Sequence, residues 1–548
     1  MADLPTNVKP LSLQEGYPDY TREAGAVQKR DTDRASTAAG LVGPDADRAE
    51  WLEWPRRFQQ KYRRPPRILH LGNVANYAYV NAKLMRAHGI EAEVFDPDFF
   101  HIMATPEWIE AHVEGDHGDD FRPDWTAVNL NGYKAPQWFL QTPMTMGLSY
   151  LAMNRSSWDA RSLRKVIDAH RRTVGVGDGF VGGVHAAGVS QNVFMRGMKR
   201  AVRESMSFWS KLKGERFDLP ELPDPHTEED AGPSIIGVNM LRESFQRAFA
   251  RYDIVQGYTI SAAYPLAAGV KNTVAYELGT LRGLPFEDSP MGKLCAWTYR
   301  NAAATFVTNV DCVSSAHKLG IAPEKINAML HAFDLDGAVA HARNPAAPRH
   351  SAEVPFFFAP ARHHWKMGNA SWLKGNDVYI RAAGQLARRG YEFRFVMIEW
   401  GEELGLSRAL IEQEGITDRV DWLRPLCRTR LWPYYLGAAA VVDQFKAPAF
   451  GGVALETLAL GRPLISAFDR EASRQFFGSA PSMFNVSTVE DVADAMAKVL
   501  DDPAGAQEIG LGGQRWMQNE HSVERQLSDQ YRVYDSLVAR NGISAQQR

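Results

Sequence analysis

Two basic residues follow short apolar runs in the second half of the chain. Arg362 comes after the run VPFFFAPA, and Lys374 precedes Gly375 at the start of an amphipathic stretch. A guanidinium can grip two phosphate oxygens at once, and an ammonium at a helix start adds a point charge where the helix dipole also favours an anion. The pair therefore indicates an anion site. The alternative is that both are solvated surface cations.

A glycine pair and a glutamate stand further along the chain. Gly451 and Gly452 precede Glu456 in the segment AFGGVALETLALGRPLI, residues 449–465. Small residues let the backbone approach a ligand, and a carboxylate can accept hydrogen bonds from hydroxyl groups. The alternative is a glutamate near a helix start that complements the helix dipole without any ligand.

Alternating strands and helices must position these residues. From residue 355 the apolar pattern predicts, in order, VPFFFAP, VYIRAAGQLARRG, EFRFVMIEW, SRALIEQEG, VDWLRP, RTRLWPYYLGA, AAVVDQF, VALETLALG and PLISAF. This order is typical of a doubly wound α/β domain, which we place at residues 355–525. Residues 526–548 are predicted to form a closing helix, and its return to the N-terminal domain is left open.

The N-terminal half carries a similar pattern. RILHLGN, ANYAYVNAKLMRAHG and IEAEVF read as strand, helix and strand, with the turn Gly72-Asn73 at the end of the first strand, where ligands bind in open parallel sheets. We predict a Rossmann-like domain over residues 66–345 with insertions, and a linker near 335–355. Residues 100–230 are not assigned a role, and the glycine-dense stretch 174–189 favours a mobile loop or tight turn over a dinucleotide site.

The segment 449–465 resembles the signature of retaining glycosyltransferases of the glycosyltransferase-B fold, family 4 type. In that signature a glycine-rich loop leads into a helix with a glutamate and then a Gly-x-Pro strand start. FFFAPARHHW, LKGNDVYIRAAGQL and GITDRV agree with it in order, and the resemblance covers about residues 67–535. It implies two Rossmann-like domains that face each other across a cleft.

The resemblance also implies a reaction. A sugar passes from a nucleotide diphosphate donor, used as co-substrate, to an acceptor of unknown identity on the N-terminal domain, with retention of configuration. It implies no permanently bound cofactor and no metal. Arg362 and Lys374 would stabilise the leaving diphosphate, with Lys366 as the alternative to Lys374. Binding of the donor nucleotide-sugar is assigned to Gly451, Gly452, Glu456, Asp443 and Gln444; the last two are equally interpretable as residues that cap a strand.

Two departures from the family pattern leave a second function open. A further glutamate is expected where this sequence has Pro448, and a histidine is expected where it has Leu278 in NTVAYELGTLRG. Glu277 or Arg282 would then line the acceptor side of the cleft, together with Gly72 and Asn73. The rival hypothesis is a catalytically inactive nucleotide-sugar-binding or regulatory protein of the same fold.

Composition excludes other classes. The 548 residues carry a formal net charge of -3, which does not indicate nucleic-acid binding. The three cysteines, Cys295, Cys312 and Cys427, form no metal or disulfide pattern, so a reducing cytoplasm is expected. No run of 18 apolar residues occurs, so neither a membrane span nor a secretory leader is expected. Asp96-Pro97-Asp98 resembles a DxD metal motif but is interpreted as a turn. The oligomeric state is left open.

The first 65 residues are predicted to be a polar arm followed by a helix. Trp51, Trp54 and Phe58 share helical spacing beside several arginines within residues 48–64. Either this segment is a basic amphipathic helix at a membrane surface, or it packs its aromatic residues onto the domain behind it. The second interpretation is favoured because Pro55 interrupts the periodicity.

Overall fold

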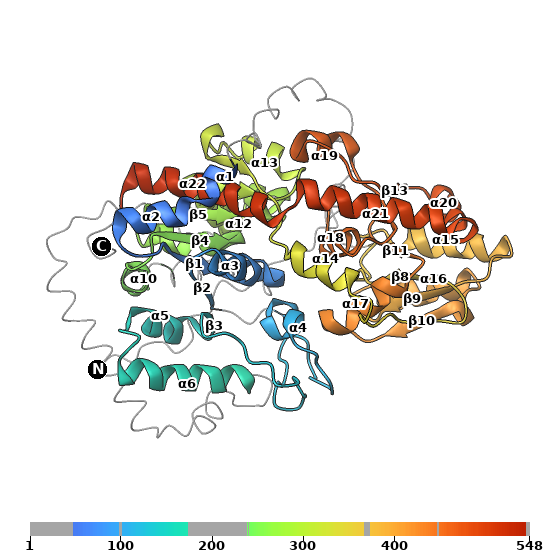
Figure 1. Cartoon of the computed structure of the whole chain (residues 1–548), viewed down its shortest axis with the longest axis horizontal. Helices are drawn as coiled ribbons and strands as arrows, with labels where there is room; N and C mark the ends of the chain where they lie inside the picture. Colours follow the sequence, from blue (N-terminus) through green and yellow to red (C-terminus); the bar gives the residue numbers. More distant parts are fainter. Residues whose placement is uncertain are drawn as a thin grey trace, which may run out of the picture.

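The computed structural model describes residues 48–97, 101–173, 238, 241–366, 373–446 and 449–543. Within them the chain forms two parallel β-sheets with interleaved helices, one in each half (Figure 1). The prediction of two Rossmann-like, doubly wound α/β domains is confirmed. The glycine-dense stretch 174–189, Asp98, Pro448 and most of the N-terminal arm lie outside the described residues.

The N-terminal sheet has seven strands in the order β3-β2-β1-β4-β5-β6-β7. Their bounds are β1 (Arg67–Leu71), β2 (Glu91–Asp96), β3 (Phe139–Gln141), β4 (Ile254–Tyr258), β5 (Thr273–Tyr276), β6 (Ala304–Val307) and β7 (Ile326–Ala328). The strands are runs of buried residues, as expected for a sheet covered on both faces. The strand order reverses between β1 and β4, so the loops after these two strands border the crevice where such sheets bind ligands.

The C-terminal sheet has six strands in the order β10-β9-β8-β11-β12-β13. Their bounds are β8 (Phe356–Ala359), β9 (Arg394–Ile398), β10 (Val420–Leu423), β11 (Ala440–Val442), β12 (Leu464–Ser466) and β13 (Phe484–Asn485). Its helices are α15 (Asn376–Arg388), α16 (Leu404–Gln413), α17 (Arg428–Gly437), α18 (Gly452–Ala459), α19 (Arg470–Phe477), α20 (Val489–Asp501) and α21 (Pro503–Glu520). The order reverses between β8 and β11, which places their following loops beside the C-terminal crevice.

The described helices of the first half are α1 (Arg48–Leu52), α2 (Trp54–Tyr62), α3 (Tyr77–Ala87), α4 (Pro106–Glu110), α5 (Met144–Ala152), α6 (Trp158–Arg172), α10 (Arg242–Phe249), α11 (Ala263–Ala267), α12 (Pro290–Asn301), α13 (Cys312–Lys318) and α14 (Leu335–Arg343). Three of these described helices, α6, α12 and α14, begin with a side-chain cap. Ser157 and Ser289, for example, accept a hydrogen bond from the third residue of α6 and α12 respectively. These caps satisfy amide groups that a helix start leaves unpaired.

Helix α14 occupies residues 335–343 of the segment predicted as a linker. The side chain of Asp334 caps the helix by accepting a hydrogen bond from the amide of Gly337 at 3.1 Å. Leu335 and Val339 are buried in the core. The apolar face and the cap explain why this polar-looking stretch is helical.

The last helix, α22 (Val523–Asn541), packs against the first domain, beside α1 and α2 (Figure 1). Tyr534 donates a hydrogen bond to Gln256 at 2.6 Å, and the ring of Tyr531 lies 5.5 Å from that of Trp54. Trp54 and Phe58 are 1% and 3% exposed, which supports the packing interpretation of the N-terminal helix. Contact between residues 48–64 and a membrane stays a prediction.

Residues 101–133, here named the docking segment, extend from the N-terminal domain to the C-terminal one. Their apolar side chains, among them Trp108 and Trp125, form a small core that also includes Cys427 of the C-terminal domain. The docking segment therefore joins the two domains through residues that are far apart in the sequence.

Candidate functional site

Lys374 lies at the centre of a polar cluster in the C-terminal domain. Its Nζ donates a hydrogen bond to Oε1 of Gln444 at 2.6 Å. A Cβ atom placed on Gly451 would lie 3.8 Å from Gln444 Oε1, 3.9 Å from Lys374 Nζ and 4.0 Å from Asp443 Oδ2. The loop before α15, the end of β11 and the start of α18 thus bring these four residues together, and glycine leaves open space between them.

The electrostatics of this cluster are unusual for a lysine and an aspartate. Burial lowers the pKa of Lys374 to about 8, with smaller contributions from the positive charges of Arg362 and Arg282, while Asp443 opposes the shift. Burial also raises the pKa of Asp443 to about 6, against the effect of Lys374. Between about pH 6 and pH 8 both groups are charged. Among the described residues, none donates a hydrogen bond to the buried Oδ2 atom of Asp443.

Arg362 and the two candidate lysines occupy different positions. Arg362 follows β8, and its carbonyl accepts a hydrogen bond from Asn376 Nδ2 at 3.2 Å, which fixes the loop. Lys366 is exposed, and its backbone amide donates to Glu403 at 2.8 Å. Lys374, in contrast, is partly buried among polar groups. The geometry therefore favours Lys374 over Lys366 as the anion-binding lysine.

Glu456 is the fifth residue of α18 and forms an ion pair. Arg428 Nε lies 3.0 Å from its Oε1 atom, and the two side chains are 21% and 13% exposed. Because Glu456 is not in the first turn, the alternative of a dipole-complementing residue does not account for it. Its charge adds to burial in raising the pKa of Tyr77, from the N-terminal domain, to about 12. Glu456 thus lies where the two domains meet.

The start of α18 adds a further feature. Gly451 precedes the helix and has no side chain, so the first amide groups have no side-chain cap. Amide groups at a helix start carry partial positive charge and bind anions. They lie beside Lys374, because Gly451 does so. A negatively charged ligand would be stabilised by both.

The candidate residues Gly72 and Asn73 of the N-terminal domain form a turn after β1. Gly72 follows β1 with φ +82° and provides the sharp turn that the strand end requires. Asn73 is buried, and its Nδ2 donates to Asn76 at 3.0 Å and to the carbonyl of Ala104 at 2.6 Å. Its Oδ1 accepts from the amide of Tyr79 at 3.0 Å. These bonds hold the side chain of Asn73 and fix the turn, and contact between the turn and a ligand stays a prediction.

Glu277 is also an internal residue. It is 0% exposed, accepts hydrogen bonds from the amide of Gly279 and from Asn309, and burial raises its pKa. Arg282 makes a bidentate pair with Asp311, at 2.6 and 3.0 Å. Of these two, Arg282 is the one whose charge reaches Lys374 across the domains. The prediction that Glu277 lines the cleft is not supported, whereas Arg282 lies close to the C-terminal cluster.

Sequence reasoning missed Arg428 and Tyr77. Arg428 begins α17, whereas Glu456 belongs to α18, 28 residues further on. Tyr77 comes from the other domain. No spacing rule connects residues on such different elements, and the strand-end rule does not apply to either of them because each begins a helix. Their positions beside Glu456 come from tertiary contacts.

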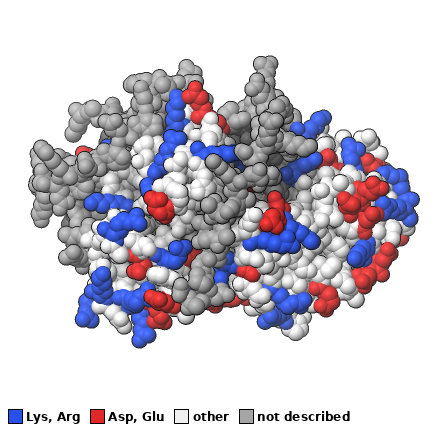
Figure 2. All heavy atoms as spheres, turned by 90° about the horizontal axis from the view of Figure 1, so that it is seen from above, with Lys and Arg blue, Asp and Glu red and all other residues white. Residues whose placement is uncertain are grey.

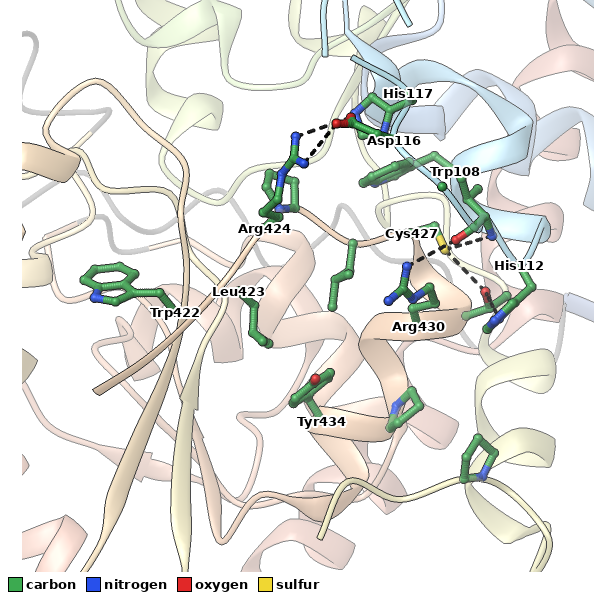
Figure 3. A pocket seen from close by; sticks show the side chains of 17 residues that line it. Trp108, His112, Asp116, His117, Trp422, Leu423, Arg424, Cys427, Arg430 and Tyr434 are labelled. Atoms are coloured by element: carbon green, nitrogen blue, oxygen red, sulfur yellow. Dashed lines mark hydrogen bonds and ion pairs between the residues drawn. The ribbon is translucent and has the colours of Figure 1, made fainter. Parts of the chain in front are cut away.

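A pocket of about 540 Å³ lies between the docking segment and the β10–α17 region (Figure 3). Trp108, His112, Trp422 and Tyr434 are among its lining residues. Among the described residues that line it, none belongs to the Lys374 cluster. Arg424 bridges the domains there, with Asp116 at 3.2 Å.

Among the described residues, no group of three or more His, Cys, Asp or Glu side chains is placed to hold a metal ion. Asp96 of the DxD motif is buried and accepts a hydrogen bond from Gln141 at 2.9 Å. None of the helices described is both long and apolar enough to cross a bilayer. Figure 2 shows basic and acidic side chains interspersed over the face seen from above.

Comparisons with known proteins point to one class. Residues 365–516 match the family model described as glycosyl transferases group 1. A D-inositol 3-phosphate glycosyltransferase of Gordonia bronchialis is 32% identical over 193 residues, which are 33% of this chain and 42% of the relative. Another from Kribbella flavida is 27% identical over 227 residues, 38% of this chain and 51% of the relative. The chain thus spans about half, or less, of the length of these curated relatives.

A solved glycosyltransferase from Rickettsia africae has a TM-score of 0.49 and 11% sequence identity, and the comparison covers 86% of this chain and 98% of that one. The family match includes the Lys374 cluster, Arg428 and Glu456, whereas Arg362 and the N-terminal domain lie outside it. The family match and the curated relatives support a glycosyltransferase, and the family match falls on the domain that holds the polar cluster.

Proposed function

We propose that this protein transfers a sugar from a nucleotide diphosphate donor to a hydroxyl-bearing acceptor, with retention of configuration. The observation that carries the proposal is the convergence of Lys374, Gln444, Asp443 and Gly451 beside the start of α18. The family match over residues 365–516, which includes this cluster, supports it. Polar groups that converge at the carboxyl ends of parallel strands are typical of a ligand site.

The leaving diphosphate needs fixed positive charge, and the cluster supplies it. The ammonium group of Lys374 lies near the positive charges of Arg362 and Arg282, and these charges add to burial in lowering its pKa to about 8. A diphosphate placed there would be attracted by all three charges and by the amide groups of α18. Lys374 and Arg362 therefore bind the diphosphate in this proposal, with Arg282 contributing from the N-terminal domain.

The remaining residues take the other parts of the donor. The carboxylate of Glu456 accepts hydrogen bonds from the ribose hydroxyls, and Gly451 and Gly452 allow close approach of the backbone. Asp443 and Gln444 face the same space, and the Oδ2 atom of Asp443 is available to accept a hydrogen bond from a sugar hydroxyl. The acceptor binds on the N-terminal side of the site.

The chemical step balances without a protein nucleophile. The bond between the anomeric carbon and the diphosphate oxygen breaks, and its electron pair leaves with the diphosphate. The acceptor oxygen bonds to the same face of the anomeric carbon, and its proton passes to an oxygen of the leaving phosphate. Charge builds up on the diphosphate, so Arg362 and Lys374 act most strongly in the transition state.

A two-stage experiment tests the proposal. First, the melting temperature is measured with UDP, GDP, ADP and their sugars, because a ligand that binds the folded state raises it. Second, release of nucleotide from the stabilising sugar donor is compared for the wild type and Arg362→Ala, with Arg389→Met as a control in an exposed ion pair of the same domain. Binding without turnover would favour the inactive binding protein, and the absence of any stabilisation would overturn both hypotheses.

A further inference from the structure

The docking segment is fixed rigidly to the N-terminal domain. The guanidinium of Arg171 forms a bidentate pair with Glu107 of α4, and its Nε donates to Gln141 at 3.0 Å. Arg171 and Glu107 are only 8% and 4% exposed. A buried, paired charge of this kind is costly to break, since separation would leave an uncompensated charge inside the protein. The segment therefore moves with the N-terminal domain.

The other side of the docking segment holds the beginning of α17. The amide of Val113 donates to Cys427 Sγ at 3.5 Å, and Thr429 Oγ1 donates to the carbonyl of Ala111 at 2.9 Å. Cys427 is 2% exposed within the apolar cluster that the two domains share. The residues immediately before and after Arg428 are thus both bound to the N-terminal domain.

Arg428 itself points to the donor site. Its Nε lies 3.0 Å from Glu456 Oε1, and its guanidinium lies 5.8 Å from the ring of Trp432, one turn further along α17. A charge-assisted hydrogen bond restricts the carboxylate to one orientation. The carboxylate has about four acceptor positions, so its hydrogen bonds to Arg428 and to the hydroxyl of Tyr435 leave capacity for hydroxyl groups of a ligand. The ion pair and a bound ribose are therefore compatible.

We propose that Arg428 is a positioning residue for Glu456, and that the docking segment sets its place. This inference rests on the proposed function, in which Glu456 binds the ribose of the donor. The docking segment thereby contributes to nucleotide affinity in the C-terminal domain through residues 427–429, without itself touching the nucleotide. Pre-orientation of a binding group raises affinity because less freedom is lost when the ligand binds.

The first test measures the Kd of the nucleoside diphosphate that most stabilises the wild type among UDP, GDP and ADP. We expect Glu456→Gln and Arg428→Met each to weaken binding by about tenfold, and the double variant to be within about twofold of either single one, as expected for residues that act as a unit. Arg428→Lys should recover part of the loss, because it keeps a positive charge. Arg389→Met is the control and should leave the Kd unchanged.

The outcomes separate this inference from the function on which it rests. An unchanged Kd in Glu456→Gln would overturn the ribose-binding role of Glu456. A weakened Kd in Glu456→Gln, with an unchanged or tighter Kd in Arg428→Met, would overturn the positioning role alone. Additive losses in the double variant would do the same. If Arg428→Met does not fold, Arg428→Lys takes its place in the cycle with Glu456→Gln, with a smaller loss expected for the single variant.

A second test examines the docking segment. Thr429→Val removes the hydrogen bond to Ala111 while it keeps the side-chain volume, and it should weaken nucleotide binding by about two- to fivefold. The loss should disappear in the Glu456→Gln background, because the docking segment acts through this carboxylate. An equal loss in both backgrounds would show that Thr429 acts by another route and would overturn the proposed coupling.

Discussion

The edges of the two sheets use polar residues in opposite ways. At the N-terminal edge, Asn73 and Glu277 are buried and their side chains are bonded to the protein. At the C-terminal edge, Lys374 has a lowered pKa and Asp443 Oδ2 is buried with no donor among the described residues. One edge has used its polar groups to build the turns, whereas the other keeps a buried acceptor atom that the described residues leave without a donor.

This difference shows what distinguishes a structural polar residue from a binding one. Position at a strand end is shared by both edges, so position alone does not decide the matter. The two edges differ in whether the polar side chains already have hydrogen-bond partners within the protein. Buried polar groups are normally paired, and an unbalanced charge or an unpaired acceptor in a glycine-lined space indicates a ligand. The following predictions test this contrast.

The largest effect is expected at Lys374. Lys374→Met should reduce release of nucleotide from the sugar donor by about 100-fold or more, since one charge that stabilises the transition state is worth about 3 kcal/mol. Lys366→Met is the matched control, because this lysine is exposed outside the cluster. Steady-state assays of both variants make the comparison. A large loss in Lys366→Met with near-normal turnover in Lys374→Met would reverse the assignment.

A smaller effect is expected from pH. The pKa of Lys374 in the empty site is about 8, so its ammonium form is lost as the pH rises through that value. A diphosphate prefers the charged form, and its affinity should therefore fall by about tenfold between pH 7 and pH 9. Titration calorimetry with a nucleotide-sugar would measure this slope. The slope should be absent in Lys374→Met, and an equal slope in that variant would assign the titration to another group.

The sequence was most informative where local pattern and strand-end geometry agree. Alternating apolar runs predicted β8, β9 and β11 and therefore the edge at which Lys374 and Asp443 meet. Parallel strands end at the same edge, so residues 69 positions apart could be expected together. The same rule, applied to Asn73 and Glu277, selected residues that the fold uses internally. Sequence pattern reports position and does not report whether a polar group already has a partner.

The docking segment could not be predicted for a different reason. Its one regular helix, α4, has five residues, and its strand-like pairings are the isolated bridges Glu114–Asn129 and Gly118–Pro123. Such short elements give no periodic signal. The segment is held by tertiary contacts with Cys427 and Thr429, more than 300 residues away. Arg428 was missed because its role depends on these contacts.

The N-terminal edge should respond through stability and not through binding. Glu277→Gln places an amide group where the protein donates hydrogen bonds from Gly279 and Asn309, so the free energy of unfolding should fall by about 1 to 3 kcal/mol. The Kd of the nucleotide should stay within about twofold of the wild type. Thermal unfolding and calorimetry measure the two quantities. A large loss of nucleotide affinity in a stable Glu277→Gln variant would show that Glu277 belongs to the binding site. The two sheet edges would then not differ in the way described above.

The smallest effect is expected from chelation. If Arg362, Lys374 and Arg282 together stabilise the leaving diphosphate, a divalent cation has no charge left to supply there, and activity in excess EDTA should stay within about twofold of the untreated protein. Lys374→Met sharpens the test, because a cation that can replace the ammonium would restore part of the activity when Mg²⁺ is added to the variant. Dialysis against EDTA followed by donor-cleavage assays with and without Mg²⁺ would measure both effects. Complete loss of wild-type activity on chelation, restored by Mg²⁺, would contradict the prediction. It would show that the basic residues alone do not neutralise the leaving diphosphate and that a metal ion is needed at the C-terminal edge.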